Sequence, residues 1–184
     1  MDIRVVDEVC GGSSGEDYPQ RFETPMFRDV FVEGDVAWLV DGSHLWRVAL
    51  DAPDGPTREA LVRLDGHPVA LHRAGDYLWV ASVEAALRGY RVGADRSVET
   101  DDPVVLFDGM GPRVMDVDGA GGGLYAALGS AGLGIVALDE SGAPAGSHRL
   151  PVPGFHVGVH ATKDRVFSAK CDAAQVYEPP LGTP

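Results

Sequence analysis

The chain has 184 residues, of which 45% are hydrophobic and 23% charged, and this is enough for one domain with a buried core. Its formal net charge of −13 argues against a general binder of nucleic acids or anionic membranes, because phosphate contacts need clustered Lys and Arg. No run approaches 18 apolar residues and the N-terminus lacks an apolar signal segment, so we expect a cytoplasmic protein. Two cysteines, Cys10 and Cys171, are consistent with that compartment, and we expect both to be free thiols. A disulfide between them is the alternative if the chain ends meet.

The first predicted strand covers residues 3–9, which read Ile-Arg-Val-Val-Asp-Glu-Val. A glycine- and serine-rich stretch, residues 11–18, follows it. Two interpretations of this stretch stay open: a flap over a binding site, or a linker.

Four repeats of one strand-rich plan follow, at about residues 24–64, 65–107, 108–150 and 151–178. Each has an apolar strand, a tight turn, a second strand with an aromatic residue, a turn of small residues and a third strand. A fourth strand is predicted after each of the first three repeats, at residues 59–64, 104–107 and 147–150. No long segment shows helical periodicity, so the pattern predicts an all-β protein.

An aromatic column aligns the repeats. Three positions after each predicted hairpin turn comes an aromatic residue, and the four are Trp38, Trp79, Tyr125 and Phe167. We interpret them as core residues between neighbouring sheets.

The fourth repeat has no fourth strand after it, and residues 3–9 precede the first repeat where such a strand is expected. This arrangement predicts a single-domain β-propeller of four antiparallel blades, whose last blade is closed by the N-terminal strand. The alternative is that the chain forms half of an eight-bladed dimeric propeller. The chain is therefore expected to be a monomer or a homodimer.

Two stretches carry a resemblance to a known family. Gly75-Asp76-Tyr77-Leu78-Trp79-Val80-Ala81 and Gly132-Leu133-Gly134-Ile135-Val136-Ala137-Leu138 resemble the repeat motifs of bacterial β-propellers of the LVIVD type. The resemblance covers about residues 24–178. It implies the propeller fold and carries no catalytic residue across, and the chain departs from the six to eight blades usual in that family.

Ligand sites of propellers usually lie where the innermost strands and the loops leading into them meet. The predicted inner strands are residues 28–32, 69–73, 113–117 and 156–160, and each brings ionisable side chains. For catalysis we predict His67 or His156 as the proton-transfer group, Asp29 as its orienting partner and Arg113 as the group that holds a carboxylate or an oxyanion. The predicted ligand contacts are Arg28, His72, Asp116, His160 and Trp46.

No cofactor or metal is predicted, because the chain has no HExxH motif, CxxC pair or other spaced ligand cluster. A zinc or iron centre built from His67, His156 and Asp29 is the alternative. Asp116 and Asp118 share one strand face, which suits acid–base work, calcium binding or a solvated turn.

Two functions from different classes follow. The first is a small-molecule-binding propeller, in its sharpest form a cofactor-independent bacterial enzyme of the lyase, isomerase, cyclase or hydrolase type. The second is a non-catalytic protein–protein interaction module. A deep pocket with converging His, Arg and Asp favours the first, and a flat face with these residues already paired to each other favours the second.

Overall fold

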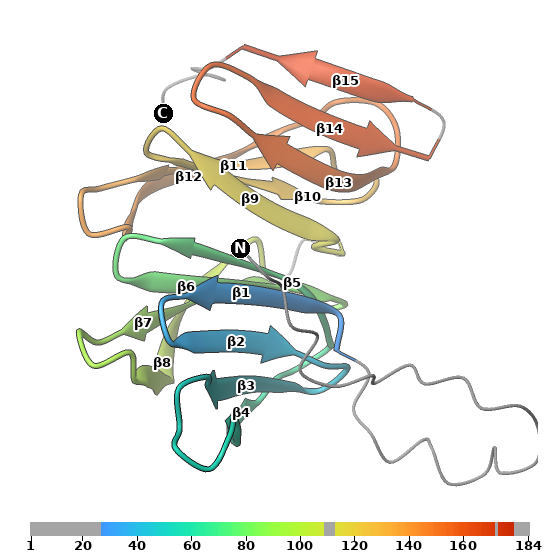
Figure 1. Cartoon of the computed structure of the whole chain (residues 1–184). Helices are drawn as coiled ribbons and strands as arrows, with labels where there is room; N and C mark the ends of the chain where they lie inside the picture. The colour runs from blue at the N-terminus through green and yellow to red at the C-terminus, as the bar shows by residue number, and fades with distance from the viewer. Residues whose placement is uncertain (1–26, 109–112, 172, 179–184) are drawn as a thin grey trace, which may run out of the picture.

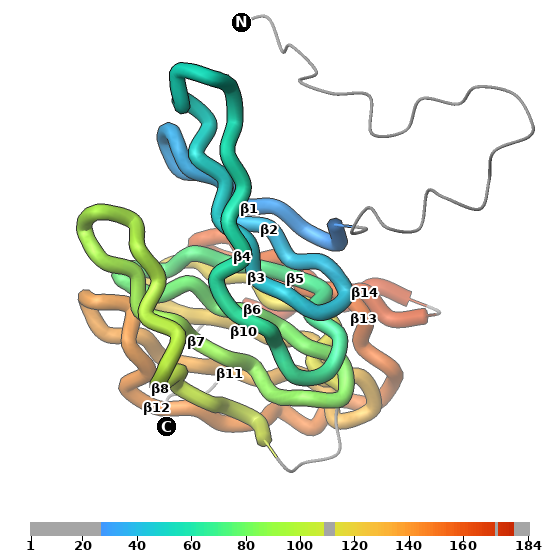
Figure 2. Tube along the Cα trace, turned by 90° about the horizontal axis from the view of Figure 1, so that it is seen from below, coloured from blue at the N-terminus to red at the C-terminus, as the bar shows by residue number. Residues whose placement is uncertain are grey.

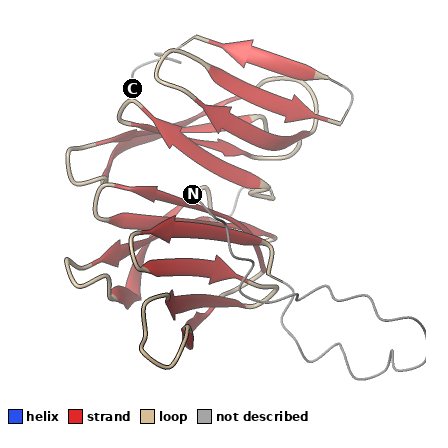
Figure 3. Ribbon diagram, viewed as in Figure 1, coloured by secondary structure: helices blue, strands red, loops and turns tan. Residues whose placement is uncertain are grey.

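The computed structural model describes residues 27–108, 113–171 and 173–178, and all regular structure within them is β-strand (Figure 3). The described residues contain no helix that is long and apolar enough to cross a membrane. The strands are β1 (Asp29–Glu33), β2 (Val36–Val40), β3 (His44–Ala49), β4 (Thr57–Arg63), β5 (His67–Ala74), β6 (Tyr77–Val83), β7 (Leu87–Val92), β8 (Val98–Leu106), β9 (Asp116–Ala120), β10 (Gly123–Ala127), β11 (Leu133–Leu138), β12 (Pro144–Leu150), β13 (His156–Ala161), β14 (Val166–Lys170) and β15 (Ala174–Tyr177).

Each predicted repeat forms one antiparallel sheet whose strands follow one another in chain order. We name them sheet A (β1–β4), sheet B (β5–β8), sheet C (β9–β12) and sheet D (β13–β15). The first three have four strands and sheet D has three among the described residues. The all-β prediction is confirmed, and the predicted strand 3–9 lies outside the described residues.

The sheets stand in a row in the order A, B, C, D, and their first strands lie side by side (Figure 1). These inner strands are β1, β5, β9 and β13, each in contact with the next. The outer hairpins splay away from the row, and the β3–β4 hairpin (teal) projects beyond the other sheets in Figure 2. Within the described residues the row does not close into a ring, so four-bladed closure stays a prediction.

Three apolar clusters fill the spaces between successive sheets. Trp38 of sheet A packs with Leu71, Leu78 and Val80 of sheet B, and Trp79 of sheet B packs with Val117 and other residues of sheet C. Tyr125 of sheet C packs with Val159, Ala161 and Val166 of sheet D. The interpretation of the aromatic column as core between sheets therefore holds for three of its members, and Phe167 is exposed.

The third inner strand begins later than the sequence suggested. We predicted residues 113–117, and β9 runs from Asp116 to Ala120. The β9–β10 turn lies at Gly121-Gly122, where both residues have positive φ, the conformation that glycine adopts at least cost. The shift leaves Arg113 in the loop before the strand and brings Asp118 into it.

Candidate functional site

The inner strands carry one row of interacting polar side chains, centred on Asp118 in β9. Its Oδ1 lies 3.1 Å from Nδ1 of His72 in β5, and its Oδ2 lies 2.8 Å from Nδ1 of His160 in β13. The Asp118 carboxylate also accepts hydrogen bonds from the backbone amides of Gly119 and Ala161, at 2.8 and 2.9 Å. One carboxylate thus joins the inner strands of sheets B, C and D.

The electrostatics of this row favour an ionised Asp118. Its partial burial alone would raise the pKa of Asp118, but hydrogen bonds from His72 and the amides of Ala161 and Gly119, with the charge of His72, lower it to about 2. The His72 side chain is 18% exposed and the His160 side chain is 70% exposed. His72 is therefore the imidazole held in a fixed orientation, and His160 is the accessible one.

Two further aspartates tie neighbouring inner strands together. Asp29 accepts a hydrogen bond from the Leu71 amide of β5 at 2.7 Å, and Asp116 accepts one from the Val159 amide of β13 at 2.8 Å. Burial raises the pKa of Asp116, and the negative charges of Asp118 and Asp29 act in the same direction, against the amide hydrogen bonds from Val159 and Val117. Asp29 and Asp116 thus serve the packing of sheets in this structure.

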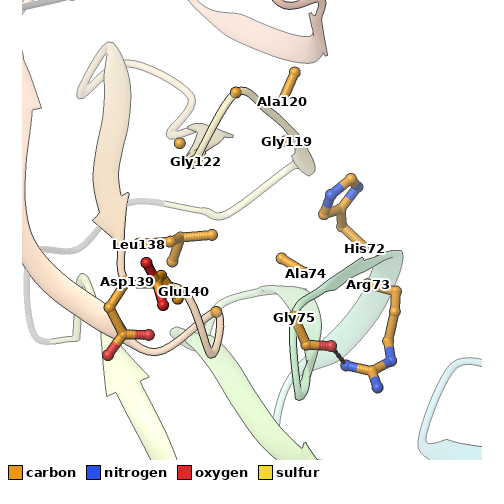
Figure 4. A pocket seen from close by; sticks show the side chains of 13 residues that line it. His72, Arg73, Ala74, Gly75, Gly119, Ala120, Gly122, Leu138, Asp139 and Glu140 are labelled. Atoms are coloured by element: carbon orange, nitrogen blue, oxygen red, sulfur yellow. Dashed lines mark hydrogen bonds between the residues drawn. The ribbon is translucent and has the colours of Figure 1, made fainter.

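Two hollows lie at the end of the molecule where the inner strands turn into the second strands. One, of about 260 Å³, lies between sheets B and C and is lined by His72, Arg73, the glycine turn 119–123 and the acidic pair Asp139 and Glu140 (Figure 4). The other, of about 450 Å³, lies between sheets A and B. Its lining is mainly charged: Glu33, Arg73, Asp76, Arg91 and Arg96.

Arg73 lines both hollows and connects them. Its Nε lies 3.5 Å from Oε2 of Glu33, and its Nη1 donates to the carbonyl of Gly75. Arg96 pairs with Asp35, whereas Arg91 is exposed on β7 at the edge of the same hollow. The hollow between sheets A and B therefore gathers three guanidinium groups in an acidic protein.

Glycine is needed beside His72. A Cβ added to Gly119 would come within 2.7 Å of Nε2 of His72 and 3.0 Å of the Gly123 carbonyl oxygen. The ring of His72 therefore lies directly against the glycine turn that lines the smaller hollow. A side chain at position 119 would therefore displace the imidazole.

The four predicted catalytic residues do not contact one another. His67 is exposed at the start of β5, 3.7 Å from Oε2 of Glu84, and Asp29 binds the Leu71 amide. His156 is completely buried, and its Nδ1 lies 2.7 Å from Oγ of Ser168. Arg113 is exposed in the loop before β9. None of the contacts among the described residues joins two of these four, and the burial of His156 withdraws its ring from any ligand.

Burial lowers the pKa of His156, and the charge of Lys170 acts in the same direction, against hydrogen bonding by the Val152 and Pro153 backbone. A neutral, buried imidazole bonded to a buried serine is a packing group. The prediction that His156 transfers a proton stays a prediction, and its burial is unfavourable to that role.

Of the predicted ligand contacts, His72, Asp116 and His160 lie on the inner strands as expected, and Arg28 is exposed just before β1. Trp46 lies in β3, where its Nε1 donates to Oδ2 of Asp41 at 2.7 Å and the Arg58 guanidinium lies 4.7 Å from its ring centroid. Trp46 is thus bonded to Asp41, which organises the turn between β2 and β3. The structure brings together His72 and His160 through Asp118, and leaves Arg28 and Trp46 apart from them.

Sequence reasoning missed the arginines of the larger hollow and the central place of Asp118. A signal for Asp118 was present, because His72, Asp118 and His160 each stand seven residues before an aromatic of the column. The three arginines come from different turns and strands, and no sequence pattern joins them. Among the described residues, no group of three His, Cys, Asp or Glu side chains is arranged to hold a metal ion.

No protein-family model matches the chain, and no curated protein matches it. Solved structures with a similar fold are β-propellers. The computationally designed Ika4 protein matches with a TM-score of 0.61 at 9% identity, over 84% of this chain and 92% of that one. The WD40 β-propeller domain of Doa1 matches with a TM-score of 0.65 at 11% identity, over 84% of this chain and 52% of that one.

Glutaminyl cyclase of Myxococcus xanthus matches with a TM-score of 0.52 at 12% identity, over 84% of this chain and 66% of that one. The chain thus spans nearly all of Ika4 and about half of the Doa1 structure. These likenesses establish a propeller-like fold, and the LVIVD type stays a prediction.

Proposed function

We propose that the protein binds a small molecule carrying an acidic group at the end where the two hollows lie. The observation that carries the proposal is the position of Arg73, which lines both hollows. On one side it is accompanied by Arg91 and Arg96, and on the other by His72 with its Asp118 partner. Guanidinium groups bind carboxylates and phosphates with two parallel hydrogen bonds, so an acidic group fits the larger hollow.

The neighbouring imidazole adds a chemical capacity. His72 presents Nδ1 to the Asp118 carboxylate, an arrangement that fixes the orientation of the ring. A substrate anchored by the arginines and reaching into the smaller hollow would meet a base of this kind. In support, a glutaminyl cyclase shares the fold, although at 12% identity no residue carries across.

The test uses citrate and inorganic phosphate as probes, with binding followed by calorimetry and by thermal shift at low ionic strength. We expect a melting temperature that rises with probe concentration, and an affinity that falls about tenfold or more in Arg91→Gln. Arg63→Gln is the matched control, because Arg63 is an exposed arginine of β4 outside both hollows. Absence of binding by both probes, or an equal loss in the two variants, contradicts the proposal.

The second candidate, an interaction module, is favoured by a different observation. The ionisable groups of the inner strands are already paired with one another or with backbone amides, as Asp29, Asp116 and Asp118 show. Such pairing is the arrangement expected of a scaffold. If citrate and phosphate leave the protein unchanged, this candidate takes precedence.

A further inference from the structure

The two ends of the row of sheets carry exposed apolar side chains at the positions that are buried between sheets inside the chain. Between sheets inside the chain, an aromatic residue of the second strand packs in one cluster with an apolar residue of the next inner strand. The three pairs are Trp38 with Leu71, Trp79 with Val117, and Tyr125 with Val159. All six side chains are buried.

At the ends of the row the same positions are exposed. Phe167 of β14 is the fourth member of the aromatic column and is 37% exposed. Val30 of β1 is the first member of the column Val30, Leu71, Val117 and Val159, and it is 53% exposed. Both columns have the same spacings along the chain. Val30 therefore holds the position in sheet A at which Leu71, Val117 and Val159 pack against the aromatic residue of the preceding sheet.

Each exposed position has an apolar neighbour on its face. Val32 follows Val30 on the same side of β1 and is 56% exposed, and Val176 lies directly opposite Phe167 in the β14–β15 pair and is 55% exposed. We call Val30 and Val32 the leading face and Phe167 and Val176 the trailing face. Side chains of this size left in water on strand faces indicate an interaction surface.

The aromatic on the trailing face is already placed as in the internal interfaces. The Phe167 ring stacks on His160 with centroids 6.3 Å apart, and in sheet A the Trp38 ring lies 6.3 Å from Phe31. In both sheets the two residues are cross-strand partners in the first hairpin. The trailing face is therefore preformed to receive an inner strand like β1.

The β1 strand of the same chain does not reach the trailing face. In Figure 1, sheets A and D are at opposite ends of the row, with sheets B and C between them. We propose that two copies of this chain associate head to tail, the trailing face of each packing on the leading face of the other. Two such contacts would close a ring of eight sheets. A head-to-tail interface forms a closed ring when the rotation between successive copies returns to the first copy, here after two copies.

Two observations on the chain ends agree with a second copy of the chain as the partner of these faces. Sheet D has three described strands where the other sheets have four, and residues 1–26 precede β1. In the proposed ring, β1 of one copy lies beside sheet D of the other. The proposal stands on the two faces alone and is independent of the proposed ligand site.

The test is the mass of the full chain in solution, measured by sedimentation velocity and light scattering. We expect twice the chain mass of 19.4 kDa for the wild type, and the chain mass for both Phe167→Asp and Val30→Asp. Val105→Asp is the matched control, because Val105 is a comparably exposed valine on β8 away from both faces, and it should keep the double mass. Circular dichroism confirms that each variant is folded.

Mixing the two monomeric variants tests the head-to-tail geometry. A Phe167→Asp copy keeps an intact leading face and a Val30→Asp copy keeps an intact trailing face, so the mixture should recover dimer through one intact contact. A wild type of 19.4 kDa overturns the proposal, as does a dimer that only one of the two substitutions dissociates, since that result indicates a symmetric contact of one face with itself.

Discussion

At the scale of single residues, Asp118 is the side chain through which three inner strands are joined. We expect Asp118→Asn to lower the free energy of unfolding by about 1–3 kcal/mol at neutral pH, because the amide replaces a charged acceptor of several hydrogen bonds. The pH dependence has a definite sign. Since folding lowers the pKa of Asp118 from 3.8 to about 2, its contribution is complete above about pH 4 and is lost as the pH falls toward 2.

The measurement is urea unfolding of the wild type and Asp118→Asn at a series of pH values from 2 to 6. The difference in unfolding free energy between them should shrink as the pH falls through this window. Asp51→Asn serves as control, because Asp51 is exposed in the β3–β4 connection. A constant difference across the series would show that Asp118 does not act through its charge.

Residue types and spacing indicated which inner-strand positions are polar, and they placed His72, Asp116 and His160 correctly on inner strands. They did not separate accessible side chains from buried ones. His67 and His156 both stand at the start of an inner strand, and one is exposed while the other is completely buried. His156 lies against the β10–β11 turn of sheet C, where it pairs with Gly129 through the backbone, a contact between residues 27 positions apart that no local pattern reveals.

At the scale of elements, the stability of each sheet depends on the aromatic residue that it inserts into the next one. We expect Trp79→Ala to cost about 3–5 kcal/mol, because Trp79 is fully buried among residues of sheets B and C. Phe167→Ala should cost less than about 1 kcal/mol in dilute monomer, because that side chain is partly in water before any assembly.

Chemical denaturation of both variants at low protein concentration checks this contrast. Trp38→Ala is the internal comparison, since Trp38 is also fully buried between two sheets and should behave like Trp79→Ala. Equal costs for Trp79→Ala and Phe167→Ala in the monomer would mean that Phe167 is covered within its own chain.

The repeat and its aromatic column were sufficient to predict four sheets of consecutive strands, because turn residues and alternation are local signals. These signals did not predict the correct first residue of β9. Met115, Asp116, Val117 and Asp118 alternate between apolar and charged side chains across the end of the predicted strand and the start of the actual one, so alternation alone does not fix where the strand begins. The glycine turn at 121–122 fixes its end, and the strand length then sets its beginning.

At the scale of the whole molecule, repeats define which sheets are neighbours but not the angle between them, which depends on packing summed over every interface. The sequence therefore left open a closed ring of four blades and half of a ring of eight. The exposed and matching ends of the row support the proposed ring of eight, and both arrangements stay predictions that the mass in solution separates. The same limit applies to the larger hollow, where sheet A adds Glu33 to the three arginines of sheet B.

Self-association makes stability depend on protein concentration, because a dimer that dissociates on unfolding is favoured by mass action. A tenfold dilution lowers the stability of a dimer by about 1.4 kcal/mol, or about 0.7 kcal/mol per chain. For a chain of this size we expect the melting temperature to fall by about 1–3 °C per tenfold dilution. Phe167→Asp should melt at one temperature at every concentration, and Val105→Asp should follow the wild type. If the wild type also melts independently of concentration, the unit that unfolds is the single chain, and the exposed faces at its two ends contribute nothing to its stability.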